Sequence, residues 1–312
     1  MNFATQLTGN ATWATSLQYR DFRIVWGSTL LYSLGTGMEQ VAIGWLVFEL
    51  TESPFMVGVA SAARMAPFFF LGALSGVVAD WVDRRSLLKF ITLGGSLVSA
   101  GMALLLLLGP ALVGYVIALV IAGGCFMAFA LTTRQAITYD IVGPEHALNG
   151  LSLTTLSMQA GGIAGAVLSG ALIQVLGPGW QYVAVSSSYL ASFAVLLAMR
   201  ATEQEGKPRA ESPLRMVAGY FQLIQQNQVL LVLMLLASAT EVFGFAYMTL
   251  LPVFAKDVLQ VGPMGLGVLT AVRQGGGLLG LSLLASLRNY RRKGVLLFVV
   301  AGGFGLGLMA FS

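Results

Sequence analysis

Long apolar runs separated by short polar turns constrain this chain more than any other feature of its sequence. A helix needs about 20 residues to cross the hydrocarbon core of a bilayer, and nine runs approach or exceed that length. They cover residues 24–48, 55–79, 87–108, 111–133, 150–176, 180–199, 229–254, 264–287 and 294–311. A backbone in lipid must satisfy its own hydrogen bonds, and no alternating pattern favours a closed barrel. The sequence therefore predicts an all-α polytopic membrane protein.

Composition supports this class. Hydrophobic residues make up 57% of the 312 residues and charged residues only 10%, whereas soluble domains carry about 25% charged residues. The 38 glycines allow helices to approach closely in lipid. The single cysteine, Cys125, excludes an internal disulfide and a metal site built from several cysteines. We expect a monomer in the lipid bilayer, with no cofactor, no bound metal and no nucleic-acid partner.

The basic residues are distributed unevenly between the two sides of the membrane. An N-terminus inside the cell puts 14 of the 17 basic residues in cytoplasmic segments, Lys256 alone outside, and Arg64 and Arg273 within spans. This bias predicts a cytoplasmic N-terminus and a multi-pass protein of the plasma (inner) membrane. The residues assigned to the cytoplasm are Arg20, Arg23, Arg84, Arg85, Lys89, Arg134, Arg200, Lys207, Arg209, Arg215, Arg288, Arg291, Arg292 and Lys293.

The stretch from Ser53 to Leu88 recurs later in the chain. An offset of 209 residues brings Pro54 onto Pro263 and Arg64 onto Arg273. An arginine within an apolar helix, ten residues after a proline, rarely occurs twice by chance. Two copies of one helical unit in the same direction are typical of a transporter built from parallel repeats.

A polar segment divides the chain into unequal parts. We predict a cytoplasmic N-terminal segment at 1–23, a six-helix bundle at 24–199, a cytoplasmic linker at 200–228 and a partial second bundle of three helices at 229–312. An interfacial helix is expected at 213–226. Two six-helix halves would need about three further spans, so we expect a fragment or a truncated gene product.

Four ionisable side chains lie deep within predicted spans: Glu39, Arg64, Glu241 and Arg273. Arg64 follows Pro54 by about 15 Å of helix, which is half of the ~30 Å hydrocarbon core. A central arginine costs about 2.5–3.5 kcal/mol unless it pairs or faces water. We predict that these four residues bind substrate or protons beside a central cavity. A purely structural Glu–Arg pair between the first two spans is the alternative.

The turn after the second span carries a cluster of charges. Asp80 lies where the helix leaves the membrane, so its carboxylate can accept from Arg84 or stabilise the positive N-terminus of a neighbouring helix. Such a contact would join the two halves in one conformational state and break in the other. Alternatively, the basic residues only retain the loop in the cytoplasm. The predicted conformational latch comprises Gly76, Asp80, Asp83, Arg84 and Arg85.

This turn resembles the signature loop of the major facilitator superfamily. Its pattern is Gly76-x-x-Ala79-Asp80-x-x-Asp83-Arg84-Arg85-x-x-Leu88. The segments Phe22-Arg23 and Leu50-Thr51-x-Ser53-Pro54 are similar to the branch of enterobactin-exporter-like and macrolide-efflux-like permeases. In that superfamily the loop contacts the eleventh helix, which this sequence does not reach. Some proton-coupled drug exporters carry a buried arginine on the fourth helix, and we expect none here.

The resemblance implies secondary active transport by alternating access: a proton-driven antiporter that exports a small amphipathic molecule, such as a drug or a siderophore-like compound. A lysolipid flippase or an uptake permease is an alternative within transport. A non-transporting scaffold or an inactive fragment is an alternative of another class. The sequence has no Gly-x-x-x-x-Gly-Lys-Ser/Thr loop for ATP and no visible Ser–His–Asp or metal constellation, so an enzyme is not expected.

Overall fold

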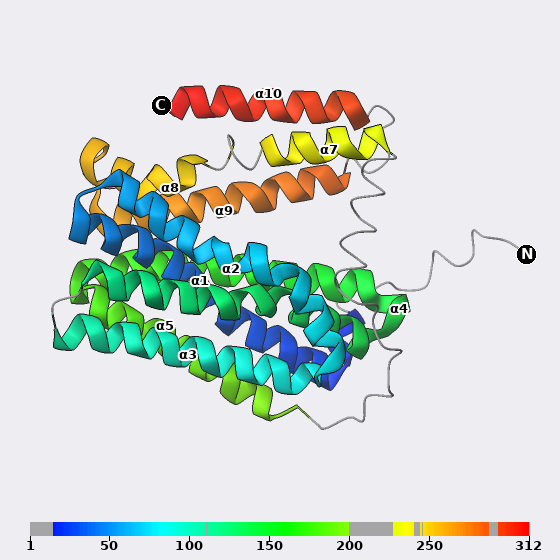
Figure 1. The fold of residues 1–312 in the computed structure, drawn as a ribbon. Helices are drawn as coiled ribbons and strands as arrows, with labels where there is room; N and C mark the ends of the chain where they lie inside the picture. The colour runs from blue at the N-terminus through cyan, green and yellow to red at the C-terminus, as the bar shows by residue number, and fades with distance from the viewer. Residues whose placement is uncertain are drawn as a thin grey trace, which may run out of the picture.

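The computed structural model describes residues 15–109, 112–199, 227–239, 244, 246–286 and 293–311. Helices α7, α8, α9 and α10 lie along one side of the group formed by α1 to α5, with the helix axes running roughly side by side (Figure 1). The predicted interfacial helix at 213–226 lies outside the described residues. The helices of the two predicted bundles therefore occupy adjacent parts of the molecule.

The first part of the chain forms five long helices after a short 3-10 turn. Their bounds are η1 Thr15–Gln18, α1 Arg20–Thr51, α2 Pro54–Trp81, α3 Arg84–Leu108, α4 Val113–Leu176 and α5 Pro178–Leu197. The second part contains α7 Gln228–Ala239, α8 Ala246–Val253, a π-helical turn η3 Phe254–Val258, α9 Gly262–Ser286 and α10 Lys293–Phe311. Every predicted span overlaps one or more of these helices. The all-α prediction is confirmed for the described residues.

Length and composition mark several of these helices as able to cross a membrane. Among the described residues, four stretches qualify: Pro54–Gly72, Arg84–Leu108, Val113–Leu176 and Pro178–Leu197. A shorter apolar helix covers Gly294–Ala310. Because α4 has 64 residues, it is long enough for two crossings, which agrees with the two separate runs in its sequence.

The apolar runs that end at residue 133 and begin again at residue 150 predict a loop between them, and this prediction is wrong. The helix of span four continues past residue 133, and the chain changes direction at Gly143, where φ is 74° and ψ is 173°. Glycine adopts this conformation without a Cβ penalty, and Pro144 then starts the following helical segment. The loop prediction treated Arg134 as solvated, but its side chain is only 1% exposed.

The two copies of the repeated stretch begin with the same local structure. Glu52 ends α1 in the left-handed region, and the Ser53 side chain accepts a backbone hydrogen bond at the start of α2. Gln260 has a similar positive φ shortly before α9. Pro54 and Pro263 each lie in the first turn of the helix that follows, where a missing N–H is tolerated. A left-handed residue and a first-turn proline thus occur at the start of both copies, although Gln260 lies one residue before the position equivalent to Glu52.

Helix α1 is the centre of the first group, and glycines bring it against α4. A Cβ on Gly37 would collide with the backbone of Gly162. Gly161 and Gly165 face the α1 carbonyls of Leu30 and Leu34 in the same way. Small residues at such crossings let helices in lipid gain contact between their backbones.

A second close crossing joins α4 to α9. Gly170 lies against the backbone of Pro263 and Gly267, and a Cβ on Gly162 would collide with the Gln274 side chain. The second half of α4 thus contacts both α1 and α9. This crossing connects the predicted six-helix bundle to the second group of helices.

The α1–α4 crossing predicts opposite effects for two glycine substitutions in α1. Gly37→Ala should lower stability by about 1–3 kcal/mol because the opposing atoms are backbone and cannot rotate away. Gly27→Ala is the matched control, since a Cβ there meets nothing within 4 Å and alanine favours helix by about 1 kcal/mol. Thermal unfolding of both variants in the same detergent measures the difference. Equal unfolding temperatures would contradict the close crossing.

Candidate functional site

A partly buried ion pair joins α1 to α2. The Arg64 Nη2 donates to Glu39 Oε2 at 3.2 Å, and their side chains are 12% and 13% exposed. The Tyr189 hydroxyl of α5 donates to the same carboxylate oxygen at 3.1 Å. One acid therefore receives hydrogen bonds from two other helices. This arrangement offsets the cost of placing both charges away from water.

The ion pair continues into a column of aromatic and cationic groups. The Tyr189 ring stacks on Tyr32, with centroids 4.9 Å apart. The Arg134 guanidinium lies over the Tyr32 ring, 4.4 Å from the ring centroid. It also donates to the hydroxyls of Thr29 at 3.0 Å and Ser28 at 3.4 Å. Packing along this column fixes where the Tyr189 hydroxyl points.

The assignment of Arg134 to a cytoplasmic loop is wrong, and so is the expectation that the fourth helix has no buried arginine. The side chain lies inside the bundle, where two hydroxyls and an aromatic face replace a carboxylate partner. Its Nε and Nη2 atoms have no hydrogen-bond partner among the described residues. In the sequence, the group Ser28, Thr29 and Tyr32 could have indicated this site, because a helix places the three side chains within about one turn.

A cavity of about 330 Å³ lies between α1, α2 and α8. Its polar lining comes from Gln40, Ser61, Arg64 and Thr249. Apolar residues form the remainder: Ile43, Gly44, Val57, Met65, Met248 and Pro252. The volume falls within the range of small-molecule sites, which combine apolar walls with a few polar groups.

A smaller cavity of about 30 Å³ adjoins it and contains Arg273 of α9. Gln40, Met248 and Pro252 line both cavities. The Tyr247 side chain of α8 lies close to the Arg273 guanidinium. The structure thus places three of the four predicted site residues, Glu39, Arg64 and Arg273, in or beside one region. Glu241 lies outside the described residues.

The linings of the two cavities are related by the sequence repeat. Val57, Ser61 and Arg64 line the larger cavity from α2. Each has a counterpart 209 residues later on α9, and these counterparts line the smaller cavity: Leu266, Thr270 and Arg273. On the preceding helices, Gln40 and Thr249 are related by the same offset. Two copies of one helix pair therefore supply the site.

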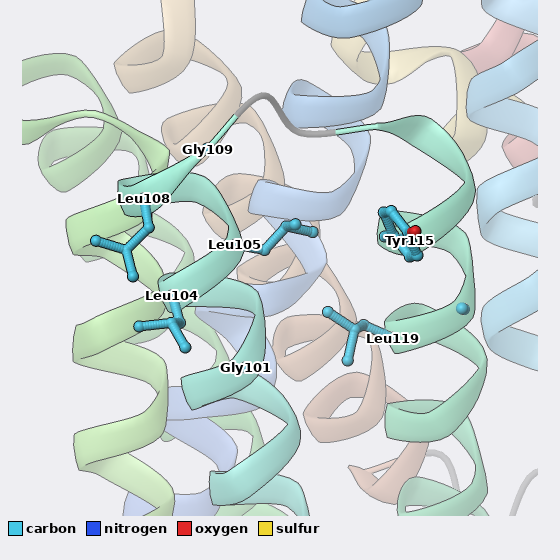
Figure 2. Close-up of a pocket in the computed structure, with 8 residues that line it drawn as sticks. Gly101, Leu104, Leu105, Leu108, Gly109, Tyr115 and Leu119 are labelled. Atoms are coloured by element: carbon cyan, nitrogen blue, oxygen red, sulfur yellow. The ribbon is translucent and has the colours of Figure 1, made fainter.

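Another cavity, of about 560 Å³, lies elsewhere, between α3 and α4 (Figure 2). Figure 2 shows leucines of both helices around it, close to Gly109. Leu104, Leu108 and Tyr115 on its walls are at least 60% exposed. Exposed apolar side chains on membrane-spanning helices contact lipid tails, and among the described residues Tyr115 is the one ionisable group that lines this cavity. We therefore place the candidate site at the smaller, charged region.

The described charges of the signature turn bind partners within the first group of helices. Asp83 caps α3 by accepting from the Ser86 backbone at 2.9 Å and from the Ser86 hydroxyl at 2.7 Å. Arg84 pairs with Asp140 of α4 at 2.7 Å, and Arg85 with Asp21 of α1 at 3.5 Å. The side chain of Asp80 and the surroundings of Gly76 lie outside the described residues. The turn is therefore tied to α1 and α4.

The cap also changes the titration of Asp83, which lies in the turn outside the membrane-spanning segments. Burial alone would raise the pKa of this carboxyl. The Ser86 side chain, the backbone N–H groups of Ser86 and Arg85 and the Arg85 charge outweigh burial and hold the pKa below its ordinary value of 3.8. A depressed folded pKa means that ionised Asp83 stabilises the fold above pH 3.8, and that this contribution is lost as the pH falls through the folded pKa.

Comparison with known proteins finds one matching family and several similar transporters. Residues 10–312 match the transmembrane secretion effector family. The staphyloferrin A transporter of Staphylococcus aureus is 23% identical over 287 residues, which cover 90% of this chain and 71% of the relative. The enterobactin exporter EntS of Shigella boydii serotype 18 is 24% identical over 292 residues, covering 91% and 70%. EntS of Citrobacter koseri is 23% identical over 291 residues, covering 93% and 69%.

The α3 cap predicts a pH-dependent difference between two variants. Asp83→Ala should lower stability at pH 7 by about 1 kcal/mol because the first-turn N–H groups lose their acceptor. Asp83→Asn keeps an acceptor and lacks the charge. Its deficit relative to the wild type should be full at neutral pH and should shrink below pH 3.8. Thermal unfolding across pH measures this deficit, and a deficit that grows toward acid would contradict the assigned sign.

The ion pair predicts a compensating double substitution. Glu39→Gln leaves Arg64 without its anionic partner and should cost about 1–3 kcal/mol. Adding Arg64→Gln removes the isolated charge and should recover part of that loss, because a neutral amide pair avoids charge desolvation. Chemical denaturation of the single and double variants gives the coupling free energy. Strictly additive losses would show that the two side chains do not interact.

Proposed function

The chain belongs to the transmembrane secretion effector family of the major facilitator superfamily, and on that premise we propose that it exports an amphipathic, siderophore-like small molecule by alternating access. The relatives named above are a staphyloferrin A transporter and enterobactin exporters, and we extend to this chain a substrate of the same general kind. The substrate site is the cavity between α1, α2 and α8 together with the adjoining cavity at α9.

The duplicated lining is the observation that supports this function most strongly. Residues of α2 and their counterparts on α9 face one region from two sides. In parallel-repeat transporters the substrate binds between the repeats, and the two halves move about that site. The glycine crossing of α4 and α9 gives these halves a close contact on which to pivot. The proposed halves are residues 24–199 and 229–312, joined by the linker at 200–228.

Glu39 is the proposed proton-binding group for coupled export, with Glu241 as its candidate counterpart in the second half. The Glu39 carboxylate lies beside the substrate cavity and holds Arg64 in place. Protonation would weaken the bond from Arg64 and change the charge that the cavity presents to substrate. Proton binding and substrate binding would then be linked through one side chain.

The signature turn is the proposed cytoplasmic latch, which also requires the N-terminus to lie inside the cell. Arg84 and Arg85 fasten the turn to α4 and α1, so the turn moves with the first half as one body. Asp80 would then contact the opposite half in one state. We propose that the transporter works as a monomer in the inner membrane, without a cofactor and without covalent catalysis.

Export can be measured with the purified full chain in proteoliposomes, with staphyloferrin A and enterobactin as separate probes. We expect a pH gradient to drive accumulation of at least one probe above that in protein-free liposomes. Glu39→Gln should abolish the response to the gradient while exchange without a gradient persists, because the gradient acts through this carboxylate. Arg23→Gln, at an exposed arginine bonded to the Leu17 carbonyl, is the matched control.

The alternatives give different outcomes in the same assay. Gradient-driven transport that survives Glu39→Gln would remove this residue from coupling. Transport of lysolipid and of neither siderophore would support a flippase. No transport of any probe by folded protein would support a non-transporting scaffold and contradict export.

A further inference from the structure

The two arginines of the duplicated lining differ in how they are neutralised. Arg64 pairs with Glu39 of the preceding helix at 3.2 Å. The position 209 residues after Glu39 is Met248, which lines both cavities. Within the part of the chain that the structure describes, Arg273 interacts with the Tyr247 side chain and with no carboxylate. At these two equivalent positions the repeat preserves the cation and has a thioether where the first half has a carboxylate.

A half-buried arginine beside a cavity, with no carboxylate among its described neighbours, requires an explanation. A guanidinium removed from water without an anionic partner is costly, whether or not a neutral hydroxyl accepts one of its hydrogen bonds. Arg273 is half-buried and lines a cavity that shares Gln40, Met248 and Pro252 with the larger one. Its charge is therefore available to a ligand that occupies the combined space.

We propose that Arg273 is the anion-binding residue of the transport cavity and takes a carboxylate or a comparable oxyanion of the substrate. This inference rests on the proposed function, since it names the chemistry of the substrate at that site. Arginine presents two parallel N–H donors that match a carboxylate. Thr270 and Gln40 lie on the same lining and supply neutral polar groups beside the anion.

The remaining walls define the other end of the ligand. Ile43, Val57, Met65 and Met248 surround the larger cavity with apolar groups. Methionine side chains adapt to differently shaped apolar partners. The expected substrate therefore has an anionic group directed at α9 and an apolar or aromatic body between α1 and α2.

Equilibrium dialysis of the full chain in detergent tests this chemistry with two matched probes. 2-Naphthoate and 2-naphthamide share one aromatic body and differ in charge. We expect the wild type to bind the carboxylate at least about tenfold more tightly than the amide, because a hydrogen bond to a charged group is worth that factor or more. Arg273→Gln should abolish the preference and leave amide binding unchanged, and Arg273→Lys should retain part of it.

Met248→Glu gives an independent test that leaves Arg273 in place. It installs in the second half the acid that the first half has at the equivalent position, so it should neutralise Arg273 and reduce the preference by the same factor. Arg23→Gln should leave both affinities unchanged. If Arg273→Gln does not fold, Met248→Glu decides the question.

Equal binding of the two probes by the wild type would overturn the inference, as would an unchanged preference in Arg273→Gln or Met248→Glu. These affinities are equilibrium quantities and need no gradient or orientation. A chain that binds naphthoate through Arg273 and exports nothing would contradict the proposed function alone. Export that proceeds without any charge preference would contradict the inference alone.

Discussion

The cost of placing an arginine in hydrocarbon governs the interior of this protein. Arg64 lies near the middle of its span, where insertion costs about 2.5–3.5 kcal/mol without a partner. Glu39 supplies the partner, and the carboxylate is shared with the Tyr189 hydroxyl. Because these three residues belong to α2, α1 and α5, satisfying one charge fixes three helices relative to one another. The cavity beside Arg64 lies between α8 and two of these helices, α1 and α2.

The position of the Glu39 carboxylate depends in turn on packing further along α1. Tyr189 is held by its stack on Tyr32, whose other contact is the Arg134 guanidinium. A change at Arg134 would therefore reach Glu39 through two aromatic rings. Arg134 is a positioning residue in this view: it lines neither cavity of the candidate site, yet it helps to orient the Tyr189 hydroxyl that shares the acid with Arg64.

Features determined by local sequence were predicted well, and features determined by distant contacts were not. Every described α-helix overlaps a predicted apolar run, and Pro54 and Arg64 lie on one helix as expected. The pairing of Arg64 with Glu39 remained one of two alternatives. Tyr189 was missed because it approaches Glu39 from 150 residues away. Arg134 was misplaced because a charge count assumes solvent, whereas this charge is accommodated by hydroxyls and an aromatic face.

The asymmetry of the two repeats gives the two walls of the cavity different responses to a proton. With Glu39 ionised, the first half presents a neutral ion pair and the second half presents the Arg273 cation. Protonation of Glu39 would change the charge of the Arg64 wall and leave the Arg273 wall unchanged. Loss of that proton would restore the ion pair, since Arg64 would return to its own carboxylate. The change from an acid at Glu39 to Met248 at the equivalent position would thus give the described parts of the two walls different responses to a proton, which two identical repeats could not have.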